Sequence, residues 1–146
     1  GATVSRWRME TFTNGTGVRV INDAYNANPA SMAAALKAAR WIAGSHACVA
    51  VLGPMAELGA ASDVEHERVG ELAARLGIDH LIVVGENAQL IAVGAVREGV
   101  EPERVTRCDT PQEAAEAALR RARPGDVVLV KGSRAAGLER VVEAMR

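Results

Sequence analysis

Two short stretches of polar residues follow apolar runs and could bind a ligand. The first, from Asp23 to Asn28, follows Val20-Ile21 and contains an acid, a phenol and two amides. A carboxylate can accept hydrogen bonds from two neighbouring hydroxyls, and an amide both donates and accepts. Asn28 before Pro29 is also a typical helix start, because Asn caps a helix and proline there loses no amide that the helix needs. The stretch is compatible with a ligand site and equally with a turn that caps its own helix.

The second stretch, Lys131-Gly132-Ser133-Arg134, follows the apolar run 127–130. Gly132 allows a tight turn, and the amides of a helix beginning there would attract an anion beside the two cations. This pattern indicates a phosphate or carboxylate site. The alternative is an ordinary strand-to-helix turn with solvated charges. The stretch is not a P-loop, because the order is Lys-Gly-Ser and the preceding glycines are missing.

A third loop, from Gly53 to Gly59, follows the apolar run 47–52 and contains Glu57 as its single acid. Its two glycines allow sharp turns of the backbone. A role in shaping the floor of a crevice is at least as compatible with this composition as contact with a ligand.

Other residues that often carry chemistry have structural explanations here. His66-Glu67 resembles the start of a zinc-protease helix, but Gly70 stands where the second histidine would fall, so no metal site is predicted. His46 and His80 lie beside expected strand starts, and we expect them at the surface or in packing. Capping explains the serines at expected helix starts, which are Ser31, Ser62 and Ser133. The tryptophans are expected to be core or interface anchors; they are Trp7 and Trp41.

The composition excludes several classes of partner. The chain has 146 residues, 49% of them hydrophobic, and a formal net charge of −1. This is the size of one domain, and its near-neutral charge predicts neither nucleic acid nor a membrane surface as partner. No apolar run approaches the roughly 20 residues of a membrane span. Cys48 and Cys108 are expected to be free thiols, kept reduced in a cytosolic protein.

Apolar spacing and turn residues predict alternating strands and helices. A hairpin is expected around Asn14-Gly15-Thr16-Gly17, between strands over 6–13 and 18–23. Further strands are expected over 47–52, 79–84, 105–108 and 127–131. Helices are expected over 29–43, from 62 to about 77, over 87–98, from 111 to before Pro124, and around 138–145. Capping boxes are predicted at 62–65 and 110–113.

This alternation predicts a Rossmann-like α/β fold, with a mostly parallel sheet and helices on both faces. The opening hairpin should supply an antiparallel edge strand. Residues 1–146 are expected to form a single domain. Because ligands bind beyond the carboxyl ends of parallel strands, we expect residues 23–28 and 131–134 to share one crevice.

Four blocks in order resemble the C-terminal domain of the Mur ligases, and the likeness runs from Ser5 to Arg146. They are Ser5-Arg6-Trp7-Arg8-Met9-Glu10, Asp23-Ala24-Tyr25-Asn26-Ala27-Asn28-Pro29 with Ser31-Met32, Gly53-Pro54-Met55-Ala56-Glu57-Leu58-Gly59, and Val130-Lys131-Gly132-Ser133-Arg134. The motif Tyr-Asn-Ala-Asn-Pro favours the dipeptide-adding branch of this family over the branches that have histidine in this loop. The sequence departs from the family at Asn22 and Pro54, where the family often has acids.

The resemblance implies an ATP- and Mg²⁺-dependent, cytoplasmic amide-forming reaction of peptidoglycan synthesis. UDP-N-acetylmuramoyl-tripeptide would be activated as an acyl phosphate and attacked by the amine of D-alanyl-D-alanine. In this family the phosphate loop, the magnesium ligands and a carbamylated lysine belong to a central domain. That domain and the N-terminal one are absent here, and Gly1 in place of methionine suggests a fragment. We expect the chain to pack on the central domain, hold no cofactor tightly and be inactive alone.

The resemblance also implies roles for single residues. Arg8 would reach the nucleotide phosphates, and Asp23 would contact the ribose hydroxyls. Lys131 would face the phosphates or the acyl phosphate, and it is the one possible catalytic group. The residues implied to line the adenine are Tyr25, Asn26 and Asn28. Those implied to bind D-alanyl-D-alanine are Ser133 and Arg134, because a guanidinium pairs well with a carboxylate.

Two other classes of function remain open from the residues alone. One is a free-standing module that binds a nucleotide or small ligand without catalysis. The other is an α/β scaffold whose polar loops only cap its helices. The missing P-loop agrees with both, so it does not favour the ligase. A binding module is expected to bind one ligand tightly by itself, which discriminates it from part of a ligase.

Overall fold

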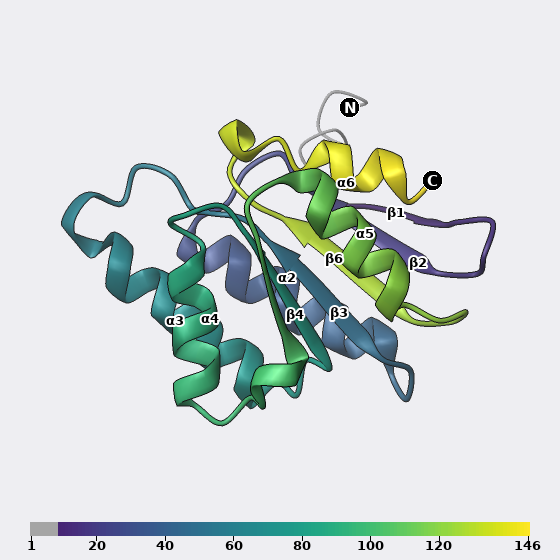
Figure 1. Ribbon diagram of the computed structural model, residues 1–146, viewed down its shortest axis with the longest axis horizontal. Helices are drawn as coiled ribbons and strands as arrows, with labels where there is room; N and C mark the ends of the chain where they lie inside the picture. Colours follow the sequence, from purple (N-terminus) through teal and green to yellow (C-terminus); the bar gives the residue numbers. More distant parts are fainter. Residues whose placement is uncertain (1–8) are drawn as a thin grey trace.

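A six-stranded sheet runs through the centre of the computed structural model, which describes residues 9–146 (Figure 1). The strand order is β1-β2-β6-β3-β4-β5. Only β1 and β2 pair antiparallel, and the other neighbours are parallel. This confirms the mostly parallel sheet with a hairpin edge. The strands are β1 (Glu10–Thr13), β2 (Arg19–Asp23), β3 (Cys48–Leu52), β4 (His80–Val84), β5 (Val105–Cys108) and β6 (Val127–Lys131).

Helices cover both faces of the sheet, as expected (Figure 1). Alternate residues of the strands point to opposite faces. Accordingly, Val127 and Leu129 of β6 pack with α2, α3 and α4, whereas Val128 and Val130 pack with α5 and α6. The sheet therefore separates two hydrophobic cores. The helices are α2 (Pro29–Ala43), α3 (Ser62–Arg75), α4 (Gln89–Arg97), α5 (Pro111–Arg121) and α6 (Glu139–Ala144).

Local capping signals were confirmed at two helices. Asn28 caps α2 with Pro29 in the first turn, and the Thr110 hydroxyl accepts from the Glu113 amide at 3.2 Å at the start of α5. The capping box predicted at Ser62 was wrong. A 3-10 turn, η1 (Gly59–Ala61), runs directly into α3, so Ala61 occupies the cap position in a helical conformation. An N-cap side chain needs an extended backbone to reach the next amides, and this turn does not provide one.

Two other expectations changed. β1 begins at Glu10, and residues 6–8 of the expected strand lie outside the described residues, as does Trp7. Trp41 is no core anchor, because it lies on α2 with 84% of its surface exposed. None of the helices in residues 9–146 is long and apolar enough to cross a membrane.

The helices α3 and α4 approach each other closely at two glycines. A Cβ atom at Gly70 would overlap the backbone carbonyl of Ile91, and one at Gly94 would overlap the carbonyl of Glu67. Backbone cannot move aside as a flexible side chain can. This contact fixes how α3 lies on the sheet, and α3 in turn supports the loop that follows β3.

We predict that Gly70→Ala lowers the free energy of unfolding by about 2 kcal/mol, measured by chemical denaturation. Overpacking a tight contact costs roughly 1–3 kcal/mol, which outweighs the gain of about 1 kcal/mol in helix propensity. Gly15→Ala is the control, because its Cβ would meet nothing within 4 Å. Equal stability of the two variants would contradict close helix packing at Gly70.

His80 gives the stability of the fold a pH dependence. The pKa of His80 is lowered to about 4, mainly by burial and to a lesser extent by the charges of Arg121 and Arg104. Its Nε2 lies 2.8 Å from the hydroxyl of Thr106. The unfolded chain binds this proton near pH 6.5 and the folded chain only near pH 4. Between these values the unfolded state holds more protons, so stability falls as the pH falls.

We predict that unfolding experiments between pH 7 and 5 show this loss, up to about 1.4 kcal/mol per pH unit from this group. His80→Gln removes the titration and should flatten the slope. His46→Gln, at an exposed histidine, should leave the slope unchanged. A His80→Gln variant with the slope of the parent chain would exclude His80 as the cause.

Candidate functional site

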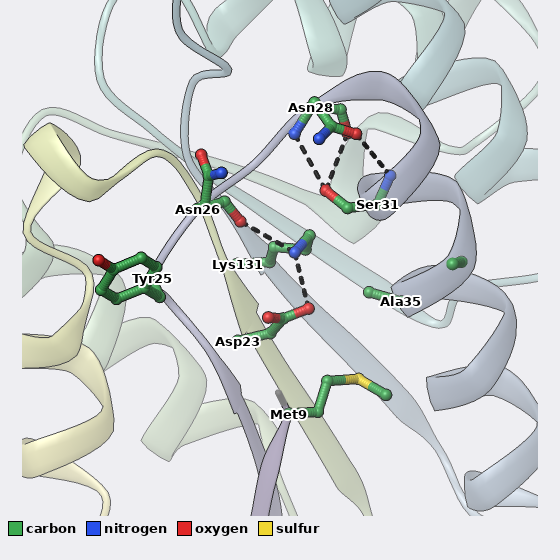
Figure 2. A pocket seen from close by; sticks show the side chains of 9 residues that line it. Met9, Asp23, Tyr25, Asn26, Asn28, Ser31, Ala35 and Lys131 are labelled. Carbon is green, nitrogen blue, oxygen red and sulfur yellow. Dashed lines mark hydrogen bonds and ion pairs between the residues drawn. The ribbon is translucent and has the colours of Figure 1, made fainter. Parts of the chain in front are cut away.

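The parallel pairing of β2 with β6 brings the two polar stretches together. In its register, Asp23 lies beside Lys131 at the carboxyl ends of both strands. The Lys131 Nζ donates to Asp23 Oδ2 at 2.7 Å and to the backbone oxygen of Asn26 at 2.9 Å (Figure 2). The Lys131 side chain is only 3% exposed and that of Asp23 15% exposed. The expectation that these stretches meet is confirmed for Asp23 and Lys131.

A pocket of about 320 Å³ lies over this ion pair (Figure 2). The end of β2, the loop that follows it and the first turns of α2 form its walls. Its floor is therefore a neutralised pair of charges, and its rim carries amides, a hydroxyl and an aromatic ring. The lining residues are Met9, Asp23, Tyr25, Asn26, Asn28, Ser31, Ala34, Ala35 and Lys131.

Asn28 has a structural role in the wall of this pocket. Its side-chain oxygen accepts from the Ser31 amide at 2.9 Å, and the Ser31 hydroxyl accepts from the Asn28 amide at 3.0 Å. This reciprocal cap starts α2. The loop therefore caps its own helix, as one of the two alternatives predicted, and it also lines a pocket.

The segment after β6 packs against the loop after β3. Gly53 donates to the backbone oxygen of Lys131 at 2.8 Å, and Ser133 donates to that of Pro54 at 2.8 Å. A Cβ at Gly132 would lie 2.8 Å from a methyl of Leu138 and 3.0 Å from the Gly53 Cα, so the close approach requires glycine.

Ser133 and Arg134 lie beside the pocket and do not line it. Ser133 is buried, whereas Arg134 is exposed, with its guanidinium carbon 5.3 Å from the centre of the Tyr25 ring. Tyr25 points toward this segment (Figure 2). The last helix, α6, begins at Glu139, as expected, but it does not follow Ser133 directly: a 3-10 turn, η3 (Arg134–Ala136), comes first and ends at Gly137 in the left-handed conformation. The amides of an α-helix N-terminus, one part of the expected anion site, are therefore not found directly after Ser133.

The loop 53–59 is partly buried and partly exposed. Met55 is buried in the core, whereas Glu57 is exposed with a φ of 61°. Both cysteines are free and buried, as expected, and burial raises the pKa of Cys48 to about 11. Within residues 9–146 no three His, Cys, Asp or Glu side chains gather where a metal ion could bind.

The sequence did not predict some of the residues that line the pocket. Met9, Ala34 and Ala35 line it without a chemical signature, although Ser31 and Ala35 share one face of a helix at i, i+4 spacing. Arg8, implied to reach nucleotide phosphates, lies outside the described residues. The direct pairing of Lys131 with Asp23 was also not anticipated, because each had been implied to face a different part of the nucleotide.

The fold is that of a ligase domain. The family described as Mur ligase, glutamate ligase domain, matches residues 7–134, so the chain belongs to the Mur ligases. Its curated relatives point to one branch. The UDP-N-acetylmuramoyl-tripeptide–D-alanyl-D-alanine ligase of Mycobacterium tuberculosis is 47% identical over 97% of this chain and 31% of its own length. The Bacillus subtilis protein of that name is 34% identical, covering 98% and 31%.

Solved structures agree with this assignment. The MurF ligase from Thermotoga maritima in complex with ADP superposes with a TM-score of 0.76 at 29% identity, over 96% of this chain and 30% of that one. A MurF structure from Acinetobacter baumannii gives 0.78 at 29% identity, over 94% and 29%. The chain thus spans about a third of the length of the relatives it matches.

We predict that Asp23→Ala lowers the free energy of unfolding by about 3 kcal/mol, because it leaves the buried Lys131 ammonium without its counter-charge. The double variant Asp23→Ala/Lys131→Met should recover much of this loss, since no buried charge remains. Denaturant titration of the 146-residue chain measures both. A double variant less stable than Asp23→Ala alone would contradict the role of the ion pair in burying Lys131.

Proposed function

We propose that this chain forms the C-terminal domain of an ATP-dependent ligase that joins D-alanyl-D-alanine to UDP-N-acetylmuramoyl-tripeptide. The observation that carries the proposal is the Asp23–Lys131 pair, which unites two polar stretches in one pocket of a Mur ligase fold. The names of the mycobacterial and Bacillus relatives support this choice of substrates.

The reaction forms an amide through an acyl phosphate. The tripeptide carboxylate attacks the terminal phosphorus of ATP and ADP leaves. The dipeptide amine then attacks the acyl carbon, loses a proton and displaces phosphate. Both steps need the reacting atoms held together and away from water, which a closing domain provides. In this proposal the chain is that domain and packs against the central domain of its own polypeptide.

The pocket over Asp23 suits the nucleoside part of ATP. Lys131 contacts Oδ2, and a carboxylate has further lone pairs with which to accept from ribose hydroxyls. The Tyr25 ring, 38% exposed, and the amide of Asn26 offer a flat and a polar contact for adenine. In this proposal Asn28 contributes the wall of the site through the cap of α2. The ADP complex of the Thermotoga relative supports nucleotide binding in the family.

Lys131 makes the pocket acceptable to an anion. An acid alone on the floor would repel the phosphates of ATP, whereas a paired acid presents little net charge. The ion pair also fixes the Asp23 carboxylate in place. A cation here can offset negative charge on the acyl phosphate, and this is the one catalytic role that we propose for the chain.

Ser133 and Arg134 are proposed to bind the incoming dipeptide. Arg134 is exposed, and a guanidinium can hold a carboxylate with two parallel hydrogen bonds. Its position over Tyr25 places the proposed dipeptide site next to the proposed adenine site. The two ligands would therefore meet at neighbouring residues of two loops.

The remaining parts of the active site are proposed to lie elsewhere in the ligase. Mg²⁺ would be held by the nucleotide phosphates and the central domain, because residues 9–146 gather no set of metal-binding side chains. Arg8 would reach the phosphates from the segment before β1. ATP and a UDP-linked precursor are cytoplasmic metabolites, so we place the ligase in the cytoplasm.

We predict that Asp23→Asn and Arg134→Ala act on different substrates in a ligase that carries this chain as its C-terminal third. Asp23→Asn should raise KM for ATP roughly tenfold, because a charged hydrogen bond contributes about 1.5 kcal/mol or more. Arg134→Ala should raise KM for D-alanyl-D-alanine by a similar factor. Arg68→Ala, at an exposed arginine of α3, is the control and should change neither.

The opposite ranking of the two variants would mean that the assignments are exchanged. Calorimetric titration of the 146-residue chain tests the class of protein. A ligase domain with half of each pocket should bind ATP–Mg²⁺ and D-alanyl-D-alanine weakly and release no phosphate. Tight binding of one ligand by the chain alone would favour a free-standing binding module.

A further inference from the structure

His66 of α3 is fully buried and uses both nitrogens of its ring. Nδ1 lies 2.7 Å from the backbone oxygen of Ser62, and Nε2 lies 3.0 Å from the backbone nitrogen of Met55. The Ser62 oxygen can only accept, so Nδ1 carries the hydrogen and Nε2 accepts from the Met55 amide. The ring is therefore a neutral link between α3 and the loop after β3.

This link continues through the loop to the segment after β6. The residue before Met55 is Pro54, whose backbone oxygen accepts from the Ser133 amide at 2.8 Å. At the start of the same loop, the Gly53 amide donates to the backbone oxygen of Lys131 at 2.8 Å. A series of hydrogen bonds thus runs from α3 through His66 and the loop to Ser133.

The loop itself has little regular structure with which to hold its position. Residues 53–58 are neither helix nor strand, and Ala56 and Glu57 are exposed. Glu57 adopts a left-handed backbone, which a residue other than glycine takes only at some cost. A loop of this kind depends on its anchors, and His66 is the anchor that comes from α3.

We propose that His66 is a positioning residue for Ser133 and Arg134, acting through Met55 and Pro54 without touching a ligand. It would set where these two residues meet the carboxylate of the dipeptide. The positioning itself rests on the geometry alone, whereas its effect on the dipeptide rests on the function proposed above. The opposing view is that His66 only fills space in the core.

Two substitutions of similar size separate these views. His66→Gln places an amide oxygen near the position of Nε2 and can still accept from Met55. His66→Asn places its amide near Nδ1, so it keeps the bond to Ser62 and loses the one to Met55. If His66 only fills space, the two variants should differ only in global stability, because Asn is one methylene smaller than Gln, and not in the exchange of Ser133 relative to the rest of the chain.

The first measurement is amide hydrogen exchange in the 146-residue chain, followed by NMR. In His66→Asn the Ser133 amide should exchange at least tenfold faster, whereas in His66→Gln it should stay within about threefold of the parent chain. The Ile82 amide in β4 reports global stability, so the exchange rate of Ser133 is compared with that of Ile82 in each variant. Equal Ser133 rates in the two variants, after each is divided by its Ile82 rate, would overturn the proposal.

The unmodified chain provides a second test should His66→Asn not fold. The amides of Met55 and Ser133 should open together, with the same dependence of exchange on denaturant. Independent opening of Ser133 would overturn the link.

The functional arm uses the ligase that carries this chain. His66→Asn should raise KM for D-alanyl-D-alanine about fivefold and leave KM for ATP within twofold, whereas His66→Gln should leave both within twofold of the parent. Faster Ser133 exchange without any change in KM for the dipeptide would retain His66 as the positioning residue and refute dipeptide binding by Ser133 and Arg134.

Discussion

The burial of one ammonium group organises this end of the molecule. Lys131 ends the central strand β6, where its side chain is almost inaccessible to water. A buried charge without a partner is strongly destabilising, so a carboxylate must stand beside it. Asp23 meets that demand from β2, and the Asn26 carbonyl supplies a second acceptor. The chain between these two acceptors is thereby held over the strand ends. The shape of the pocket follows from the neutralisation of this charge.

The same few residues serve stability and binding. Asn28 and Ser31 cap α2, and their positions in the cap also place them in the pocket wall. Gly132 is needed because two loops touch, and that contact holds Ser133 against Pro54. In such a site one side chain can serve both roles, because the lone pairs and surface that the structural contact does not use remain available to a ligand. Substitutions here are therefore informative only when stability is measured along with binding.

The sequence predicted local structure better than contacts between distant segments. Apolar spacing and the Asn28-Pro29 signal placed α2 at its observed bounds, and β5 and β6 were placed equally well. The failures have local causes: one 3-10 turn occupies the cap position before Ser62, and another, in place of an α-helix, follows Ser133. The insertion of β6 between β2 and β3 was not predicted, because strand order depends on pairings across the whole chain. The motifs therefore predicted residues that line the pocket, but they did not predict the ion pair between Asp23 and Lys131.

The strand order has a consequence for how the molecule is made. β6 is the last strand of the sheet in sequence, yet it lies between β2 and β3 and joins both hydrophobic cores. During synthesis, the edges of β2 and β3 that later pair with β6 stay unpaired until residues 127–131 leave the ribosome. Pairings so distant in sequence form slowly, and open strand edges are prone to aggregation meanwhile. The ligand pocket is assembled in that same closing event, so an incompletely translated chain cannot contain it.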